Sequence, residues 1–495
     1  MVNVKIIDLA FSPTRVKINI NDQVKWTWTG GAPHSTTSSG GLWDSGVHGT
    51  GFTFTNTFPN AGSFPYMCSV HPVMAGYVTV QAANVTNGTA TIVVAINGNG
   101  TVTPNYNGQM LTIGKTYTMT AKPAVGNLFS NWTGSLTIST PALTFIMQTN
   151  TSFQANFVPS PFGTNNATYN GLFFDTNSFS AESAGTFTLA LTPAGKFTGK
   201  FQQGATRLSF NGLFGISGTA IGSLSRPGKS TLGVALQLDP SNTDRITGIF
   251  TDGISVLNLV AARAAFDGRT RIAPQAGLYT MTIPGAQGTN SLPGGISYAT
   301  FTVDTAGKIK LLGSLSDSTK IAQATAISKN GDWPFYVALY GGQGAIFGWL
   351  SFQTTQTNDL SGQIFWGKTN VPSSKFYPSF NFATTASGFR YHPPAPGQNV
   401  LGFANGTLEL SGGDLPQPII NHISIGANNR VTNLSSNLLT LTFKSTTGSF
   451  SGKVTRPGSA QSVSFGGVVA PAMNTGFGYF LGTTQSGPVI LEAAP

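Results

Sequence analysis

One short segment gathers three side chains that can bind a soft metal ion. The only cysteine, Cys68, is followed by His71 three positions later and by Met74 six positions later. A thiolate, an imidazole and a thioether on one tight turn are three of the four ligands of a mononuclear blue-copper site, in which two His and one Cys lie in a plane and a Met binds weakly on the axis. Because Cys and Met are soft donors and imidazole suits both oxidation states, such a set can hold Cu(I) and Cu(II) alike.

The fourth ligand must come from elsewhere in the chain, and His34 is the candidate. It follows the alternating stretch Val24 to Trp28, so we expect it just past the end of a strand, where a loop can bring it over the Cys68 turn. The ordinary alternatives are that Cys68 is an inert core thiol and that Met74 only fills apolar space. The coincidence of four residue types at these spacings favours one copper ion held by His34, Cys68, His71 and Met74.

The elements that must position these ligands read as short strands. Over the first 81 residues, apolar residues alternate with polar ones, and clusters of Gly, Pro, Asn and Ser separate the runs. The alternating residues are Val16, Ile18 and Ile20, then Val24, Trp26 and Trp28, then Phe52, Phe54 and Phe58. This spacing suits an antiparallel β-sandwich in which one face of each strand lies in a shared core.

This segment resembles a small cupredoxin of the plastocyanin, pseudoazurin and amicyanin group, over about a sixth of the chain. The likeness is carried by Phe11-Ser12-Pro13, Asp22 to Trp28, Pro33-His34-Ser35, Trp43 to Gly46, Phe54 to Gly62 and Cys68 to Val80. The short Cys-x-x-His-x-x-Met spacing is most similar to the amicyanin-like branch. By motif, the resemblance implies a type 1 copper site with His34, Cys68 and His71 in the plane and Met74 on the axis.

The resemblance also implies how electrons would enter and leave. Family members often have Asn after the first histidine, with its backbone amide pointing at the thiolate, and the amide of Ser35 can make the same contact here. An apolar collar around the edge of His71, where a redox partner docks in related proteins, would consist of Ala32, Pro33, Pro72 and Val73. These four residues could equally serve only to cover the metal.

The composition describes a multidomain, turn-rich, all-β protein. The chain has 495 residues, 61 Gly and 28 Pro, and it contains few charged residues and one cysteine, which excludes an internal disulfide. No segment approaches the roughly 20 consecutive apolar residues of a membrane span, and the first residues lack a signal-peptide pattern. The net charge of +10 comes from scattered basic residues rather than a nucleic-acid-binding run. It indicates attraction to acidic proteins, to an anionic polymer or to a cell surface, or it serves solubility alone.

A second, smaller β module is expected at residues 89–158, after a polar linker from Ala82 to Gly88. It resembles the divergent InlB-type bacterial repeat, a spacer or adhesive unit of surface proteins, in Gly100 to Pro104, Tyr117 to Ala121 and Asn131 to Gly134. Cupredoxins and such repeats are typically exported. The resemblance therefore implies an extracytoplasmic protein that is periplasmic, secreted or attached to the cell surface.

Residues 165–495 repeat one pattern of strand, Gly-containing turn, strand and Gly-rich strand pair. The copies begin near residues 165, 277 and 400, and they share segments such as Gly185 to Gly199, Ala299 to Ile309 and Leu439 to Gly452. Because repeated antiparallel hairpins must hide their sheet edges, we predict a large antiparallel barrel or barrel-like array, with a propeller as the alternative. A membrane-embedded barrel is less favoured, because a long globular half precedes this region.

Catalysis is not indicated by the residues that remain. A multicopper oxidase or a copper nitrite reductase needs many more grouped histidines, whereas the other three here, His48, His392 and His422, lie far apart in the sequence. We interpret His48, in the Gly46 to Gly51 loop, as an exposed loop residue. The few acids form no evident glycosidase pair, and no Gly-x-Ser-x-Gly elbow or Walker loop is present.

Two functions remain. The first is an extracytoplasmic blue-copper protein that transfers single electrons to or from a redox partner, which could be an acidic protein or a c-type cytochrome. The second is a structural or adhesive cell-surface protein whose β-barrel region binds a polymer or other subunits, with the copper domain as an accessory. Neither function calls for catalytic residues.

Overall fold

The structure is a computed structural model that describes residues 1–81, 88–162, 166–176, 180, 182–239, 242–286, 288, 290–353, 358–456 and 461–495. The predicted linker, apart from its last residue, lies outside this part of the chain. The described residues are almost entirely in strands, and their helices are the short 3-10 turns η1 (Tyr340–Gly342), η2 (Ala427–Asn429) and η3 (Pro471–Met473). None of the described helices has the length and apolar character needed to cross a membrane.

The first 81 residues form two four-stranded sheets packed face to face. One sheet has the order β2-β1-β4-β6, with β1 (Val2–Ile7), β2 (Ala10–Ser12), β4 (Gln23–Trp28) and β6 (Thr53–Thr57). The other has the order β3-β8-β7-β5, with β3 (Arg15–Asn19), β5 (Thr37–Ser38), β7 (Gly62–Met67) and β8 (Ala75–Gln81). The sandwich was expected to be antiparallel, but β1 runs parallel to β4 and β3 runs parallel to β8. Alternation in the sequence does not encode strand direction, because it fixes only which side chains face the core.

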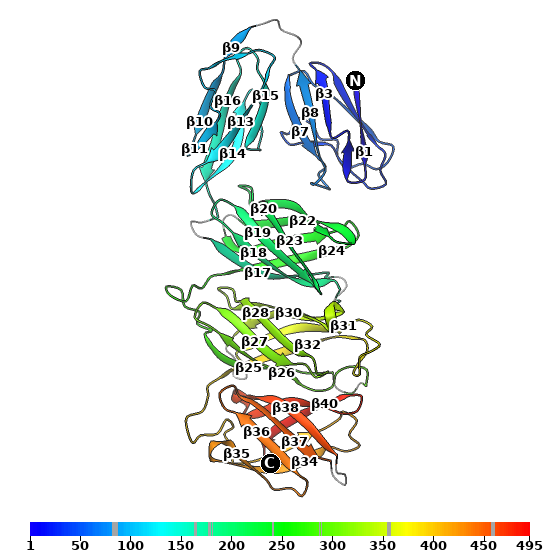
Figure 1. Cartoon of the computed structure of the whole chain (residues 1–495), viewed down its shortest axis with the longest axis vertical. Coiled ribbons are helices and arrows are strands. Elements are labelled where there is room, and N and C mark those ends of the chain that lie inside the picture. Colours follow the sequence, from blue (N-terminus) through cyan, green and yellow to red (C-terminus); the bar gives the residue numbers. More distant parts are fainter. Residues whose placement is uncertain are drawn as a thin grey trace.

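The repeat module lies beside this sandwich, at the same end of the molecule (Figure 1). Its strands are β9 (Thr89–Thr91), β10 (Val93–Asn97), β11 (Gly100–Thr103), β12 (Met110–Thr112), β13 (Thr116–Pro123), β14 (Asn127–Gly134), β15 (Ala142–Ile146) and β16 (Ser152–Pro159). They form the sheets β10-β16-β14, β11-β13-β15 and β12-β9 around the fully buried Trp132. Leu136 packs against the cores of both the module and the copper-ligand sandwich. It sits so close to Gly62 that a Cβ there would lie 2.9 Å from its side chain.

The remaining region forms three nearly closed eight-stranded barrels that follow one another along the chain. Their sheet orders are β20-β19-β18-β17-β24-β23-β22-β21, β28-β27-β26-β25-β32-β31-β30-β29 and β35-β34-β33-β40-β39-β38-β37-β36. In each barrel the first strand pairs with the last, so the order is the same in all three. The barrel-like region predicted from the repeats is thus three small barrels in series.

The strands of the first barrel are β17 (Ala167–Phe174), β18 (Ala184–Leu191), β19 (Lys196–Gln203), β20 (Thr206–Leu213), β21 (Thr219–Arg226), β22 (Lys229–Asp239), β23 (Asn242–Thr251) and β24 (Val256–Ala264). Those of the second are β25 (Gly277–Ile283), β26 (Ser297–Val303), β27 (Lys308–Ser314), β28 (Lys320–Ala326), β29 (Asp332–Leu339), β30 (Gly344–Phe352), β31 (Leu360–Lys368) and β32 (Phe380–Tyr391). Those of the third are β33 (Asn405–Leu410), β34 (Ile419–Gly426), β35 (Arg430–Asn433), β36 (Leu439–Lys444), β37 (Ser449–Thr455), β38 (Ser462–Ala470), β39 (Thr475–Leu481) and β40 (Ser486–Ala493).

The barrels have filled interiors. The first contains a group of mutually packed rings from Phe173, Phe187, Phe201, Phe210 and Phe250. Inward residues alternate with outward ones along each strand, so these rings close the interior and leave the polar residues outside. Polar side chains that could contact a ligand therefore lie on the outer surface of each barrel and at its ends.

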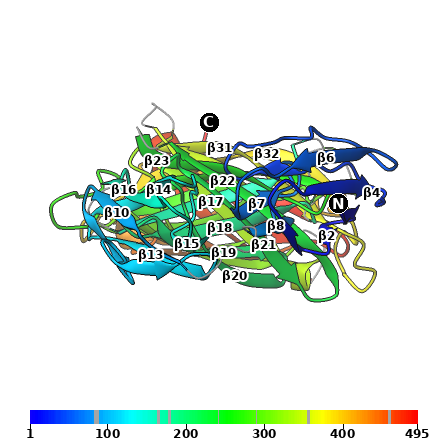
Figure 2. The same ribbon diagram turned by 90° about the horizontal axis from the view of Figure 1, so that it is seen from above.

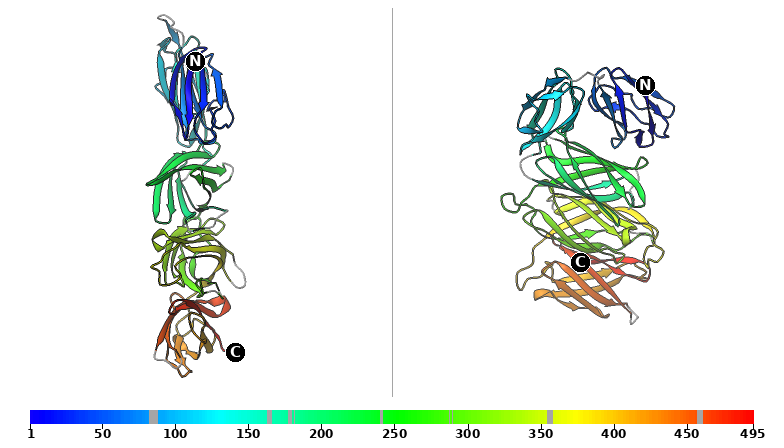
Figure 3. Two further views of the ribbon diagram at one scale, coloured as in Figure 1. Left: turned by 90° about the vertical axis from the view of Figure 1, so that its right-hand side faces the viewer. Right: turned by 45° about the horizontal axis from the view of Figure 1, so that its top comes forward.

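The barrels pack side by side, strand wall against strand wall, and form a column below the two N-terminal modules (Figures 1 and 3). Seen along the column, the two N-terminal modules lie toward opposite sides of it (Figure 2). Apolar residues around Leu172, Tyr336 and Phe347 fill the first junction. At the second junction, the Tyr479 hydroxyl lies 2.7 Å from Ser314 Oγ, and both groups are buried.

Candidate metal centre

Three of the four predicted ligands meet at one end of the N-terminal sandwich. The Nδ1 atoms of His34 and His71 lie 3.0 Å apart, and they lie 3.8 Å and 3.7 Å, respectively, from Cys68 Sγ. His34 and Cys68 are fully buried, while His71 is only partly so. The fold thus brings His34 together with two residues more than thirty positions away.

The size of this triangle fits a first-row transition metal. A point equidistant from three atoms with these separations lies about 2 Å from each, which is close to the length of metal–imidazole nitrogen bonds in proteins. Two imidazoles and one thiolate are the planar donors of a blue-copper site. The residues present therefore fit a copper ion.

Met74, the fourth predicted ligand, lies at the end of the ligand loop and is buried. Its side chain is 1% exposed and belongs to the same core as Cys68. The Cys68 amide donates to the Met74 carbonyl (3.0 Å), and the Met74 amide donates to the His71 carbonyl (2.9 Å). These two bonds close the ligand loop between β7 and β8 and keep Met74 next to the Cys68 backbone.

The strands on either side fix where this loop starts and stops. Met67, the last residue of β7, pairs with Ala75, the first residue of β8, so the loop spans a single hairpin end. Gly76 has a specific steric role, since a Cβ there would lie 2.3 Å from the Tyr66 ring. Glycine at this position leaves room for the Tyr66 ring, whose residue pairs with Gly76 across the two strands.

His34 is held by its own backbone. Its amide donates to the His48 carbonyl and its carbonyl accepts from the His48 amide, both at 2.9 Å. The indole Nε1 of Trp28 also donates to the His34 carbonyl, at 2.7 Å. The end of β4 and the loop carrying His48 together set the position of the first imidazole.

His48 lies in a loop, as interpreted, but it is not exposed. Its ring is half-buried and stacks on Phe52 with a centroid distance of 3.5 Å, while Nε2 lies 2.8 Å from the Ser45 carbonyl oxygen. The sequence could not show this, because the pairing of His48 with His34 depends on how two loops meet. His48 supports the site without facing it.

Ser35 links the two ligand-bearing loops. Its amide donates to Cys68 Sγ at 3.3 Å, which is the contact expected at this position. Its hydroxyl oxygen accepts from the Ser69 amide at 2.8 Å and lies 2.9 Å from Thr37 Oγ1. An amide donated to a thiolate stabilises negative charge on the sulfur and so tunes the potential of a bound metal.

An acidic residue that the sequence did not indicate faces His34 from the other side. The Asp8 carboxylate lies 3.7 Å from His34 Nε2, too far for a hydrogen bond but close enough for an electrostatic contact. It accepts the Ala32 amide at 3.0 Å, and this amide is the main reason that the pKa of Asp8 is lowered. A Cβ at Gly30 would lie 2.4 Å from Asp8 Oδ1, so the glycine gives the carboxylate room.

Burial keeps both imidazoles in the form that binds metals. Burial lowers the pKa of His34 and of His71, and in each case the nearby Asp8 charge opposes this shift only in part. Neutral imidazole has a lone pair to donate, whereas imidazolium has none. The site is therefore arranged for metal rather than for protons near neutral pH.

The outer edge of the site is apolar and open. Pro33 and Val73 are exposed, and Ala32 and Pro72 are half-buried, around the partly exposed His71. His392 and His422 lie on the exposed surface of the barrel region, remote in sequence from this site. Within the described part of the chain, the group of metal-binding side chains brought together is His34, Cys68 and His71.

Two protein families match parts of the chain. Residues 1–81 match the family of copper binding proteins described as the plastocyanin/azurin family, and residues 91–161 match the divergent InlB B-repeat domain. Among solved structures, a purple cupredoxin from Nitrosopumilus maritimus is 29% identical over 16% of this chain and 99% of its own, with a TM-score of 0.16. Amicyanin from Paracoccus versutus is 27% identical over 16% of this chain and 80% of its own, with a TM-score of 0.16. No curated protein matches the chain. Residues 1–81 are thus similar to the plastocyanin/azurin family of copper binding proteins, and residues 91–161 to the divergent InlB B-repeat domain.

Proposed function

We propose that this protein is an extracytoplasmic electron carrier with one type 1 copper ion bound by His34, Cys68, His71 and Met74. The observation that supports it most is the buried triangle of two imidazole nitrogens and one sulfur. Copper bound there supplies a one-electron change of oxidation state. An extracytoplasmic location is favoured because both matched modules are of kinds typical of exported proteins.

The chain's own residues would keep the rearrangement between oxidation states small. The hairpin bonds of Cys68 and Met74, the His34–His48 backbone pair and the Trp28 indole hold the ligands from three directions. Ligands fixed before the electron arrives need little reorganisation when the charge changes. This is the property that an electron carrier needs.

His71 is the proposed point of electron entry and exit. It is the ligand that reaches the surface, and exposed Val73 and Pro33 lie around it. An apolar patch allows close approach of a partner, while the net charge of +10 favours an acidic one. An acidic redox protein or a c-type cytochrome fits this description.

Electron transfer can be tested by mixing the copper-loaded full chain with a reduced c-type cytochrome in a stopped-flow instrument. We expect one electron per chain, and at least tenfold slower transfer in Val73→Glu with an unchanged Cu–thiolate absorption. Val125→Glu is the matched control, since Val125 is fully exposed in the repeat module. Equal rates in the two variants, or a copper ion that accepts no electron, would contradict the proposal.

The barrels favour a second, compatible role as a support. Three filled barrels joined by buried contacts form a column with the copper domain at one end (Figure 3). Such a column would hold the redox site away from whatever surface the other end contacts. We therefore place adhesion or spacing in the barrel region and redox chemistry in the first 81 residues.

A further inference from the structure

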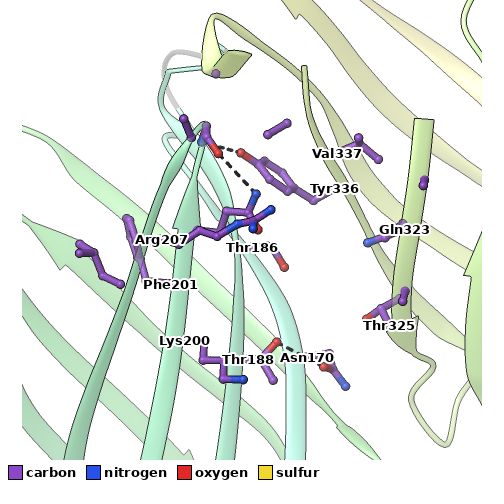
Figure 4. Close-up of a pocket in the computed structure, with 18 of the residues that line it drawn as sticks. Asn170, Thr186, Thr188, Lys200, Phe201, Arg207, Gln323, Thr325, Tyr336 and Val337 are labelled. Carbon is purple, nitrogen blue, oxygen red and sulfur yellow. Dashed lines mark hydrogen bonds between the residues drawn. The ribbon is translucent and has the colours of Figure 1, made fainter. Parts of the chain in front are cut away.

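The first two barrels enclose a cleft that the copper site does not use. Its volume is about 790 Å³, and it lies between β18, β19 and β20 of the first barrel and β28 and β29 of the second. Cavities of this size hold ligands of drug size or larger. Figure 4 shows side chains from both barrels pointing into the space, among them Lys200, Thr188 and Asn170 opposite Gln323 and Thr325.

The floor of the cleft consists of polar residues in two rows across the outside of the first barrel. Strand register places Asn170, Thr188, Lys200 and Ser209 in one row and Thr186, Gln202 and Arg207 in the next. Neighbouring strands lie about 4.8 Å apart, so the four-residue row extends about 14 Å. This is long enough for several units of a hydroxyl-rich chain and too long for a single small ion.

The charge of the cleft is one-sided. Lys200 and Arg207 are both exposed, and neither forms an ion pair with any side chain that the structure describes. They are diagonal neighbours on paired strands, and the described residues that line the cleft include no Asp or Glu. Two unneutralised cations side by side favour an anionic ligand.

The cleft is held open by the way the barrels meet. The Gly204 amide donates to the Tyr336 hydroxyl across the junction at 2.8 Å, and a Cβ at Gly204 would lie 2.9 Å from the Gly342 carbonyl oxygen. On the second barrel, the small exposed residues Ala322 and Ala324 leave space opposite the polar rows. A ligand would therefore enter a preformed site, at little cost in conformational entropy.

The type of lining distinguishes between anionic polymers. Among the described residues that line the cleft, the aromatic ones are Phe201 and Tyr336, and both are buried, so these residues offer no exposed ring on which a nucleic-acid base could stack. Hydroxyl and amide side chains both donate and accept hydrogen bonds, which suits the hydroxyls of a sugar chain. Lys200 and Arg207 suit its carboxylate or sulfate groups.

We propose that the cleft between the first two barrels binds a segment of an anionic oligosaccharide. Its acidic groups are held by Lys200 and Arg207, and its hydroxyls contact the rows that contain Thr188 and Gln202. This site is independent of copper and of electron transfer. It would anchor the column to an acidic polysaccharide and leave the copper domain free at the N-terminal end of the column.

The test is calorimetric titration of the full chain with a galacturonic acid hexamer, a sulfated maltohexaose and neutral maltohexaose. We expect binding of one or both anionic oligomers and none of the neutral one, and the two anionic arms separate a preference for carboxylate from one for sulfate. Lys200→Ala with Arg207→Ala should weaken binding at least tenfold. Lys444→Ala with Lys453→Ala removes the same charge from exposed positions of the third barrel, away from the cleft, and should change affinity less than twofold.

A second variant tests whether binding needs the space of the cleft as well as its positive charge. Ala324→Phe fills space in the cleft at an exposed position without changing charge, and it should also weaken binding at least tenfold. Unchanged affinity in Ala324→Phe, equal losses in the two charge variants, or no binding of either anionic oligomer would overturn the proposal. Tighter binding of a single-stranded oligonucleotide through Lys200 and Arg207 would overturn the assignment to a sugar.

Discussion

Two buried clusters of polar side chains differ in how many of their charged and hydrogen-bonding groups have a partner within the protein. In the second barrel, Lys368 is 4% exposed, and its Nζ donates to Ser374 Oγ (2.6 Å) and to the Phe376 carbonyl (3.0 Å). It lies 3.6 Å from the Asp317 carboxylate, which also accepts the Tyr340 hydroxyl at 2.6 Å. Each charge there has a partner supplied by the same barrel.

The cluster at the end of the N-terminal sandwich is arranged differently. Its three donor atoms face one another at 3.0 to 3.8 Å, and His34 Nε2 is buried without a hydrogen-bond partner among the described residues. A polar cluster that completes itself stabilises one fold, whereas one that gathers electron-pair donors needs a cation to complete it. The comparison teaches that a buried polar cluster points to a binding site only where its groups lack partners within the protein.

The largest expected effect comes from removing one charge from the cluster of Lys368 and Asp317 in the second barrel. Lys368→Met leaves the Asp317 charge buried without its cation, and we expect it to destabilise the second barrel by about 3–5 kcal/mol. Hydrogen exchange measured by mass spectrometry in β31 would report the loss. Combining it with Asp317→Asn should restore part of the stability, because the unpaired buried charge is removed while an acceptor for the Tyr340 hydroxyl remains. Copper binding should be unchanged in both variants, and a fully stable Lys368→Met protein would contradict the comparison.

A smaller effect is expected from one hydrogen bond that supports the metal cluster. Trp28→Phe removes one of the two donors to the buried His34 carbonyl, which keeps its bond from the His48 amide, and should cost the N-terminal domain about 0.5–1.5 kcal/mol of stability. Trp26→Phe is the matched control, because the Trp26 indole nitrogen has no hydrogen-bond partner among the described residues. Thermal unfolding of the metal-free chain should show a larger loss for Trp28→Phe, together with faster release of copper. Equal losses would mean that the His34 carbonyl does not depend on this bond.

These two clusters also show how far the sequence predicts the molecule. The Cys68 loop was predictable because its three candidate ligands lie on one hairpin end, where spacing alone sets their geometry. The barrel-like region was predictable from three repeat copies in the sequence, and the first strands of the three barrels begin at Ala167, Gly277 and Asn405. In both cases the information is local or periodic.

The parts that sequence reasoning missed depend on contacts between distant segments. Asp8 approaches His34 only because β1 runs beside β4, and the parallel direction of that pair leaves no trace in residue alternation. His48 supports His34 through a backbone bridge between two loops. The cleft beside Lys200 exists only where two barrels meet. None of these contacts is encoded in the spacing of residues within one segment.

A further contrast concerns two aspartates, Asp252 in the first barrel and Asp8 beside the metal cluster. In the first barrel, the pKa of Asp252 is lowered from 3.8, chiefly because it accepts the Ser255 amide at 3.0 Å, with the Ile254 amide and then Arg226 as further causes. Its contribution to stability is therefore present above pH 3.8 and is lost as the pH falls through the lowered value. Asp252→Asn should cost up to about 1 kcal/mol at neutral pH and make the melting of this barrel less acid-sensitive. Calorimetric scans from neutral to acidic pH would show whether the two curves converge at low pH, and parallel curves would contradict this role.

The smallest expected effect concerns the acid beside the metal cluster. Asp8 places a negative charge next to His34, which favours the more positive oxidation state of a bound metal. Asp8→Asn should therefore shift the reduction equilibrium of the copper-loaded protein toward the reduced state by about threefold, since solvent screens the exposed carboxylate. Asp22→Asn removes the same charge at the opposite end of β4 and should have no measurable effect on the potential. Voltammetry would contradict the account if both variants shifted equally or if Asp8→Asn favoured the oxidised state.

The central claim is that His34, Cys68, His71 and Met74 converge on one copper ion. Titration of the metal-free full chain with Cu(II), followed by visible absorption, tests it most directly. We predict one equivalent bound per chain with an intense Cu–thiolate band, Cys68 protected from alkylation, and complete loss of the band in Cys68→Ser. A chain that stays colourless while Cys68 reacts freely with the alkylating reagent would contradict the account.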